Sequence, residues 1–280
     1  MDHEPDDLTA LMQRRRALKL LAGAGVGLGL VALGACGSDG DSNASGTTST
    51  TSGSSSSSSS SSPSTTSGST SDVEEIPEET AGPFPGDGSN GPNVLTEDGV
   101  VRSDITSSFG SSSGTAEGVP LTVQLSIVDV ANGGAPLAGA AVYIWHCTRE
   151  GGYSMYSDGV ADQNFLRGVQ ETGSDGTVTF QSIYPGAYSG RWPHIHFEVY
   201  PNLDEATAAG DPSATSQIAL PEDISAQVYA TDGYEQSVTN LDQSSLTSDM
   251  VFSDDGAVDQ LATMSGSIDS GLTAQLTVGV

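Results

Sequence analysis

Two histidines separated by a single residue, His194 and His196, are the strongest chemical signal in the chain. The segment around them is predicted to be a β-strand, and side chains two residues apart on a strand point to the same face. The two imidazoles would therefore lie together, with Ile195 on the opposite face. Neutral imidazoles this close suit a metal ion such as iron, zinc or copper. Because the chain contains only four histidines, this pair predicts a metal site.

The histidines do not by themselves fix the other ligands. A structural zinc site would need two further cysteines or histidines, but His146 and Cys147 are neighbours whose side chains would point to opposite faces of a strand. Oxygen ligands are therefore expected. Carboxylates are plentiful, which leaves a ferrous site of two histidines and one carboxylate as one alternative. Tyrosine is the other oxygen donor: Tyr153 follows two glycines, and Tyr188 ends a Pro-Gly-Ala-Tyr run.

Charge is distributed unevenly along the 280 residues. The formal net charge is −28, and of the 8 basic residues four lie in the first twenty positions. The others are Arg102, Arg149, Arg167 and Arg191, and this later part contains no lysine. A phosphate backbone would repel so acidic a chain, which excludes a nucleic-acid partner. An anionic substrate would have to be bound by one of these arginines, a metal ion or backbone N–H groups.

The beginning of the chain resembles a bacterial export leader. Three arginines, Arg14–Arg16, precede an uncharged run of Leu, Ala, Gly and Val from Leu20 to Ala35. Such a run is short for a spanning helix, and arginines before it are typical of twin-arginine export. The Leu-Gly-Ala-Cys sequence that ends at Cys36 resembles a lipobox. We therefore predict a twin-arginine lipoprotein signal peptide at 1–35, lipidation of Cys36, and an exported protein held by lipid to the outer face of the membrane in the cell envelope.

Residues 36–72 are rich in Ser, Thr and Gly and include an unbroken serine run over 54–62. A segment of this composition has too little apolar surface to fold, so we expect a disordered tether. The composition changes near residue 73, and 73–280 is predicted to form one domain. Its only link to a membrane would be the N-terminal lipid anchor, and the sequence leaves oligomer formation open.

Short runs that alternate apolar and polar residues recur through 73–280, separated by Gly, Asp and Pro turns. This period of two is typical of half-buried strands. The expected strands are Val119–Val128, Ala140–Trp145, Gly176–Phe180, His194–Tyr200 and Thr273–Val278. Short helices are expected only near Pro221–Ile224 and Asp259–Leu261. These elements predict an all-β fold, a β-sandwich with long loops and few short helices.

A set of short motifs in a fixed order makes the metal site more specific. The motifs are Glu79–Pro83, Trp145–Cys147, Gly151–Ser154, Phe165–Gly168, Thr172–Gly176, Ile183–Tyr188, Arg191–Phe197 and Thr215–Ile218. Together they resemble the intradiol ring-cleavage dioxygenases, the group of catechol 1,2-dioxygenase and the protocatechuate 3,4-dioxygenase β chain. The resemblance covers most of 73–280.

This resemblance implies a non-haem Fe(III) ion held by Tyr153, Tyr188, His194 and His196. It also implies cleavage of a catechol-type substrate by O2 to a muconate-type dicarboxylate, with Tyr188 leaving the metal and serving as a base. Phenolate is a hard, anionic donor, and two phenolates offset most of the charge of a ferric ion in a buried site.

Two further positions carry expectations from the same resemblance. Arg191, three residues before the first histidine, is expected to contact the substrate and stabilise charge that develops on its ring. Gln217 is expected to lie near the substrate. His146 and Trp145 are expected to surround the ligands or to fill the core, and Cys147 to be a buried apolar filler. With so few cations, uncharged catechols are at least as good candidates as carboxylated ones.

One alternative belongs to a different functional class. The segment Pro136–Val142, followed later by an Asp-Gly turn, resembles small transthyretin-like sandwiches that bind carbohydrate or stabilise cell walls. A non-catalytic binding module at the cell envelope therefore stands beside the enzyme. The presence of all four ligand-type residues favours the enzyme.

Overall fold

The computed structural model describes residues 73–280. The predicted signal peptide at 1–35, the tether at 36–72 and the lipidated Cys36 lie outside the described residues. Within 73–280, no helix has the length and apolar character needed to cross a membrane.

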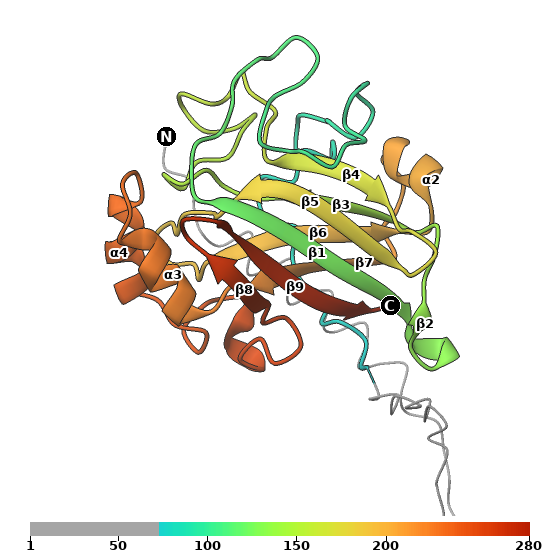
Figure 1. Cartoon of the computed structure of the whole chain (residues 1–280). Helices are drawn as coiled ribbons and strands as arrows, with labels where there is room; N and C mark the ends of the chain where they lie inside the picture. Colours follow the sequence, from blue (N-terminus) through green and yellow to red (C-terminus); the bar gives the residue numbers. More distant parts are fainter. Residues whose placement is uncertain (1–72) are drawn as a thin grey trace, which may run out of the picture. The chain divides into compact units, whose positions relative to one another are not determined.

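Two β-sheets form the architecture, and they pack face to face (Figure 1). The five-stranded sheet has the order β2-β1-β9-β8, with β5 paired to the other side of β1. The four-stranded sheet has the order β4-β3-β6-β7. The strands are β1 Pro120–Asp129, β2 Ala135–Pro136, β3 Ala141–Trp145, β4 Arg167–Glu171, β5 Thr177–Ile183, β6 His194–Tyr200, β7 Ala214–Ala219, β8 Thr263–Ser267 and β9 Gly271–Gly279. The predicted all-β sandwich is confirmed.

Helices are short and lie at the ends of the sheets. They are α2 Leu203–Thr207, α3 Glu222–Tyr229, α4 Glu235–Asp242 and the 3-10 turns η1 Val130–Asn132 and η2 Phe252–Asp254. The helix expected near Pro221–Ile224 is confirmed as α3, which begins after a proline and carries two acidic residues in its first turn, where they suit the helix dipole.

The helix expected near Asp259–Leu261 is wrong. This segment forms a turn and then a parallel bridge between Leu261 and Ala219. Gln260 accepts a hydrogen bond from the Ala219 amide at 2.9 Å, and the Ala262 amide donates to the Ala219 carbonyl at 2.9 Å. The backbone groups are thus used to extend the edge of the four-stranded sheet.

Burial of the strands follows their place in the sandwich. In β1 the odd-numbered residues Leu121, Val123, Leu125 and Ile127 are buried, while the residues between them are partly exposed. This is the predicted alternation. In β6, by contrast, all seven residues are buried, which requires cover on both faces of the four-stranded sheet.

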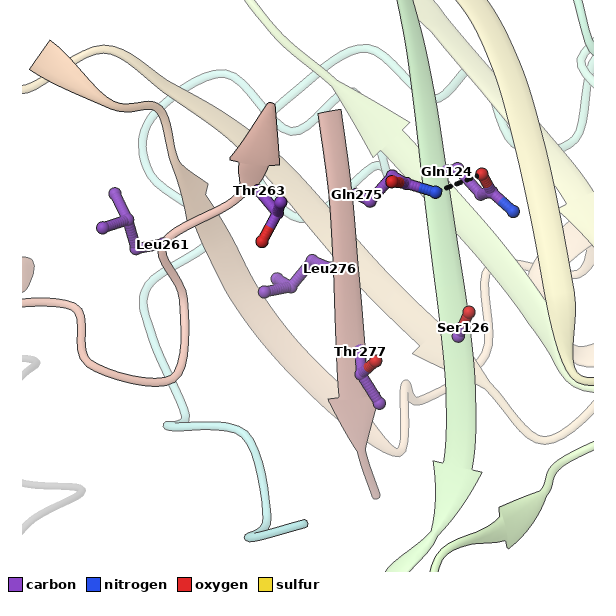
Figure 2. Close-up of a pocket in the computed structure, with 7 residues that line it drawn as sticks. All are labelled: Gln124, Ser126, Leu261, Thr263, Gln275, Leu276 and Thr277. Carbon is purple, nitrogen blue, oxygen red and sulfur yellow. Dashed lines mark hydrogen bonds between the residues drawn. The ribbon is translucent and has the colours of Figure 1, made fainter. Parts of the chain in front are cut away.

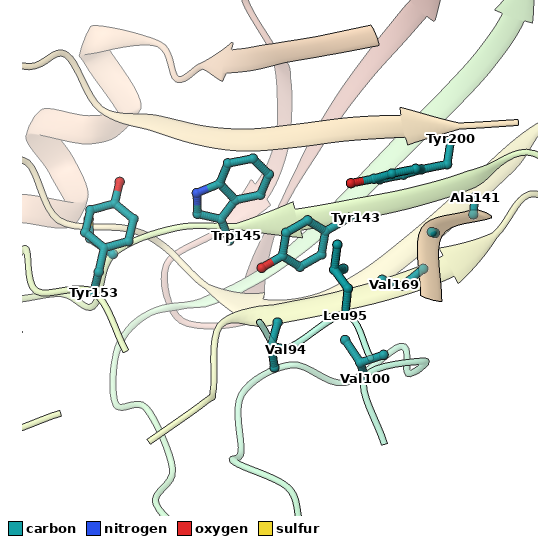
Figure 3. Packing of buried hydrophobic residues seen from close by; sticks show 11 residues of the cluster. Val94, Leu95, Val100, Ala141, Tyr143, Trp145, Tyr153, Val169 and Tyr200 are labelled. Carbon is teal, nitrogen blue, oxygen red and sulfur yellow. The ribbon is translucent and has the colours of Figure 1, made fainter. Parts of the chain in front are cut away.

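The second face of the four-stranded sheet is covered mainly by loops (Figure 3), with α2 packed at its edge. Val94 and Leu95 from the long segment before β1 pack against Tyr143 and Trp145 of β3 and Tyr200 of β6. No residue of the five-stranded sheet belongs to this cluster. We call this loop-covered side the outer face.

A row of paired residues crosses the outer face from strand to strand. Arg167 in β4 is paired with Trp145 in β3, Trp145 with His196 in β6, and His196 with Gln217 in β7. Residues paired across a sheet point to the same side. The sheet register therefore brings four polar or aromatic side chains together, although β4 and β7 were not predicted as strands.

His146 follows β3 and points away from this row, toward the five-stranded sheet. It is fully buried, and its Nδ1 and Nε2 lie 2.8 Å from the Cys147 carbonyl and 2.7 Å from Ser182 Oγ in β5. Because a carbonyl only accepts, Nδ1 carries the proton and Nε2 accepts from the serine. Burial lowers the pKa of His146 to about 4. The neutral ring therefore links the two sheets.

Replacing His146 by glutamine should weaken the dependence of stability on pH. Between pH 6.5 and 4 the unfolded chain binds a proton that folded His146 does not bind, so acid lowers the free energy of unfolding. For this one group the loss reaches about 2.5 kcal/mol near pH 4.5. The loss is obtained from the free energies of unfolding of both proteins, measured with denaturant near neutral pH and near pH 4.5. An equal loss in wild type and His146→Gln would contradict the prediction.

Candidate metal centre

Four potential metal ligands meet at one end of the outer face. Tyr153 Oη lies 3.4 Å from Tyr188 Oη, which lies 3.2 Å from His194 Nε2, and this nitrogen lies 3.2 Å from His196 Nε2. All four rings touch their neighbours in edge-on contacts. The structure thus brings together every residue that the sequence analysis predicted to bind metal.

Three separate parts of the chain supply these side chains. His194 and His196 stand at the start of β6 on the same face, as the period of two predicts. Tyr153 comes from the loop after β3, and Tyr188 from the loop before β6. A fourth segment of the chain reaches the cluster at Gly82, where an added Cβ would lie 3.2 Å from the His196 ring. Its φ of +71° is one that glycine adopts without strain.

Hydrogen bonding and stacking fix the orientation of both imidazoles. His194 Nδ1 donates to the Trp192 carbonyl, so the neutral ring keeps the lone pair of Nε2 directed at the cluster. The His196 ring stacks on Trp145 with centroids 4.9 Å apart and planes 6° apart. His196 Nδ1 has no hydrogen-bond partner among the described residues. Packing therefore holds this second ring.

Electrostatics keep both imidazoles neutral. Burial, and then the charge of Arg191, lower the pKa of His194 to about 3. Burial and the neighbouring His194 hold the pKa of His196 well below its ordinary value. A neutral imidazole is the form that binds a metal.

The pKa values of the two phenols are shifted by different neighbours. Burial raises the pKa of Tyr153 well above its ordinary value, and the nearby Tyr188 raises it further. Burial also raises the pKa of Tyr188, but Arg191 opposes this rise. Neither phenol would ionise here without a strong positive charge beside it. A donor set of two phenols and two neutral imidazoles therefore fits a hard, highly charged cation such as ferric iron.

Arg191 lies beside the cluster in a fixed orientation. Its Nε donates to Asp249 Oδ2 at 2.8 Å, its Nη2 donates to Gln217 Oε1 at 2.6 Å, and its Nη1 lies 3.4 Å from His194 Nε2. The predicted site residue thus lies where expected. Its ion pair is buried, however, with Asp249 fully inaccessible to solvent.

Gln217 is also close to the site, but its amide is already occupied. Its oxygen accepts from Arg191, and its nitrogen donates to the Thr80 carbonyl at 2.9 Å. In this structure Gln217 holds Arg191 and the segment that leads to Gly82. A direct contact with substrate stays a prediction.

The loop that carries Tyr188 is clamped by α4. Ser237 Oγ accepts from the Ala187 amide at 2.9 Å, and Asn240 Nδ2 donates to the Ala187 carbonyl at 2.8 Å. Both side chains are buried. These contacts fix the residue next to Tyr188.

Three residues at the end of β3 lie around the site without belonging to the cluster. Trp145 packs on a predicted ligand, His146 lies behind the sheet, and Cys147 is buried with its thiol donating to the Gly186 carbonyl. Throughout 73–280, no group of three or more His, Cys, Asp or Glu side chains could hold a metal. The oxygen donors beside the two histidines are the phenols, so the two-histidine, one-carboxylate alternative is not what the chain assembles.

Sequence reasoning missed Asp249, Ser237 and Asn240. Asp249 is one of 36 acidic residues, and no motif surrounds it. Ser237 and Asn240 are three residues apart, the spacing of one helix face, but the sequence did not predict α4. Only the tertiary structure connects them with the site.

An open groove lies on the exposed face of the five-stranded sheet (Figure 2). This open groove of about 320 Å³ is lined by Gln124 and Ser126 of β1, Thr263 of β8, and Gln275 and Thr277 of β9. Gln275 donates to Gln124 at 2.8 Å. The lining of this groove contains no titratable side chain and no metal ligand.

Known proteins resemble this chain in sequence and in fold. A family model described as Dioxygenase matches residues 91–202. Chlorocatechol 1,2-dioxygenase of Rhodococcus opacus is 31% identical over 103 residues, which cover 28% of this chain and 40% of that protein. The match thus spans less than half the length of this curated relative.

A solved structure extends the similarity to nearly the whole described region. An intradiol ring-cleavage dioxygenase from Tetranychus urticae is 28% identical, with a TM-score of 0.59 over 74% of this chain and 94% of that one. The segment matched by the family model contains all four clustered side chains. In sequence motifs, in the four clustered side chains and in its sandwich fold, the chain is similar to the intradiol ring-cleavage dioxygenases.

Proposed function

We propose that this protein is a non-haem, Fe(III)-dependent intradiol dioxygenase that cleaves the ring of a catechol-type substrate with O2 to a muconate-type dicarboxylate. One observation carries the proposal: two phenol oxygens and two imidazole nitrogens follow one another at distances of 3.2–3.4 Å. In a non-catalytic sandwich module apolar side chains would serve better at these positions, because the hydrogen bonds among the four groups only partly offset the cost of removing them from water.

Tyr153, Tyr188, His194 and His196 would hold the iron. When bound, ferric iron supplies a Lewis acid for the catechol oxygens and an electron acceptor that makes the ring reactive toward O2. The protein orients the donors and limits the access of water to them. Its loops and the β6 strand orient the four donors, and the surrounding core excludes water from them.

Tyr188 is the better placed of the two phenols to move a proton. Its side chain is partly exposed, whereas Tyr153 is only 2% exposed. The positive charge of Arg191 counteracts the rise in the pKa of Tyr188. As the phenolate that a bound ferric ion would stabilise, Tyr188 could take a proton from a catechol hydroxyl at Oη and become a neutral phenol as the substrate binds.

Arg191 would stabilise negative charge on the substrate. Two of its nitrogens are held by Asp249 and Gln217, and Nη1 is left facing the cluster. A donor fixed in this way needs no reorganisation when charge develops on the ring. We propose that Arg191 is catalytic and that Gln217 positions Arg191. The position of Gln217 is also compatible with a substrate that lies close to its amide.

For the N-terminal part we propose export as a lipoprotein, with 1–35 as a twin-arginine signal, Cys36 as the lipidated residue and 36–72 as a spacer. Twin-arginine export carries folded proteins, so iron could be inserted before export. Cys36→Ser should move the protein from the membrane fraction to the soluble fraction of the cell. A variant that stays in the membrane fraction would count against the lipid anchor.

The enzymatic proposal is tested with purified, iron-loaded protein. We expect a visible absorption band from tyrosinate-to-iron charge transfer that changes when catechol is added without O2. Admission of O2 should consume one O2 per catechol and give a dicarboxylic acid with both oxygen atoms incorporated, the bond between the two hydroxyl-bearing carbons having broken.

Tyr153→Phe should remove or strongly change this band. It should also lower turnover by more than the roughly 10–100-fold that is typical of changes around a metal ligand. Tyr156→Phe is the matched control, because the Tyr156 hydroxyl contacts Gly86 and Asn90 instead of the cluster. The same loss in both variants, or none in either, would argue against Tyr153 as a ligand.

Asn240→Ala should affect iron binding from a distance. The loss of its hydrogen bond to Ala187 frees the loop that carries Tyr188. A buried hydrogen bond contributes about 1–1.5 kcal/mol, so we expect iron affinity, measured by competition with a chelator, to fall about tenfold. Gln236→Ala, an amide removed from the exposed side of α4, should leave it unchanged. Unchanged affinity in Asn240→Ala would contradict the role of this clamp.

A further inference from the structure

Arg167, the first residue of β4, is a completely buried cation. Its Nη1 donates to the Phe84 carbonyl at 2.8 Å and to the Pro85 carbonyl at 2.9 Å. Its Nη2 donates to the Ser154 carbonyl at 2.9 Å, and its Nε donates to Ser154 Oγ at 3.0 Å. These oxygens are all uncharged. Hydrogen bonds to neutral groups repay only part of the cost of burying an ion, and an apolar side chain of similar size would avoid that cost. This points to a role in geometry and not in stability alone.

The hydrogen bonds of Arg167 reach Tyr153 from two directions. Ser154, whose carbonyl and hydroxyl are both bound, directly follows Tyr153 in the chain. Phe84, whose carbonyl is also bound, packs its ring against the Tyr153 ring, with the two centroids 5.0 Å apart. One guanidinium therefore fixes the backbone beside this predicted ligand and the ring that packs on it.

The turn after Tyr153 is strained and needs such support. Met155 has a φ of +73°, in the left-handed region that residues with a side chain disfavour. Strained residues persist only where the surrounding structure holds them, and they are concentrated at functional sites. The Ser154 carbonyl belongs to the peptide bond that leads into Met155, and it accepts from Arg167 Nη2. The guanidinium thus holds the strained turn at its first peptide.

The loop before β1 leaves room for this guanidinium at Gly86. An added Cβ at Gly86 would lie 3.0 Å from Arg167 Nη1 and 3.4 Å from Tyr143 Oη. Tyr143 Oη in turn donates to the Pro85 carbonyl at 2.6 Å, beside the hydrogen bond from Arg167. The loop is therefore shaped to enclose the side chain of Arg167.

We propose that Arg167 is a positioning residue for the metal centre: by fixing the Ser154 peptide and the Phe84 ring, it keeps the Tyr153 hydroxyl directed at the cluster. The inference rests on the proposed function, in which Tyr153 would hold iron. The planar guanidinium has a fork of N–H donors and binds both segments at once, whereas the ammonium group of lysine is compact and cannot span them. Arg167→Lys therefore keeps the charge and loses the positioning.

Arg102→Lys is the matched control for Arg167→Lys. Arg102 donates to the carbonyls of Arg167 and Asn164 and lies over the ring of Phe109. Its replacement also breaks hydrogen bonds to carbonyls, but its side chain donates to neither Ser154 nor Phe84.

Iron affinity is measured by competition with a chelator, and the tyrosinate-to-iron band is recorded without substrate. Arg167→Lys should lower the iron affinity by at least about tenfold and should shift and weaken the band, because Tyr153 is no longer held in place. Arg102→Lys should leave both the affinity and the band unchanged.

Two further variants assign the effect to Tyr153. In the Tyr188→Phe background, Tyr153 is the one phenol left among the four clustered side chains, and Arg167→Lys should still change the band. Ser154→Ala removes the acceptor of Arg167 Nε without removing the buried arginine. It should change the band in the same direction as Arg167→Lys, by a smaller amount.

Four results would overturn the inference. Wild-type iron affinity and an unchanged band in Arg167→Lys would show that Arg167 only supports the fold, even if this variant is less stable. An effect that disappears in the Tyr188→Phe background would act through Tyr188. If Arg167→Lys does not fold, an unchanged band in Ser154→Ala decides against the inference. If iron-loaded wild type shows no tyrosinate band, the proposed function itself fails, and the inference fails with it.

Discussion

The close approach of four buried donor atoms is the constraint on which the rest of this structure depends. Tyr153 Oη, Tyr188 Oη, His194 Nε2 and His196 Nε2 form a chain in which each atom lies 3.2–3.4 Å from the next. Each of these groups gives up hydrogen bonds to water, and the hydrogen bonds among them replace those only in part. The β3–β6 pairing, the Trp145 stack and the two loops all serve to hold them there.

Much of this arrangement follows from local patterns in the sequence. The alternation in β1 predicts a half-buried strand, and the His-x-His spacing predicts the pair of imidazoles on one face, because strand periodicity is a local property. The two tyrosines are implied only by the resemblance to the intradiol dioxygenases, since the residues alone leave the oxygen ligands open. Non-local properties were missed. β4 and β7 lack a clear alternation, and the segment near Asp259–Leu261 becomes an edge bridge because Ala219 offers its backbone groups there.

The residues that support the site show the same limit of sequence reasoning. Asp249 lies 58 positions after Arg191, and Asn240 lies 53 positions after Ala187. A carboxylate or an amide carries no sign of its eventual partner in a chain with 36 acidic residues. Such contacts are set by how α4 and the loop after it fold back onto the segment before β6. Pairings of this kind become visible only in the tertiary structure.

The surroundings of the two tyrosines argue for different roles. Tyr153 belongs to the loop-covered core, and its amide donates to Ser157 Oγ at 2.9 Å, so ring and backbone are both held. Tyr188 is followed by an exposed turn: the Arg191 amide donates to its carbonyl at 3.2 Å, and Ser189 and Gly190 between them are exposed. A side chain at the edge of an exposed turn moves at a smaller free-energy cost than one in a packed core. If the cluster binds iron as proposed, Tyr153 would be the ligand that stays and Tyr188 the one that yields its place to substrate.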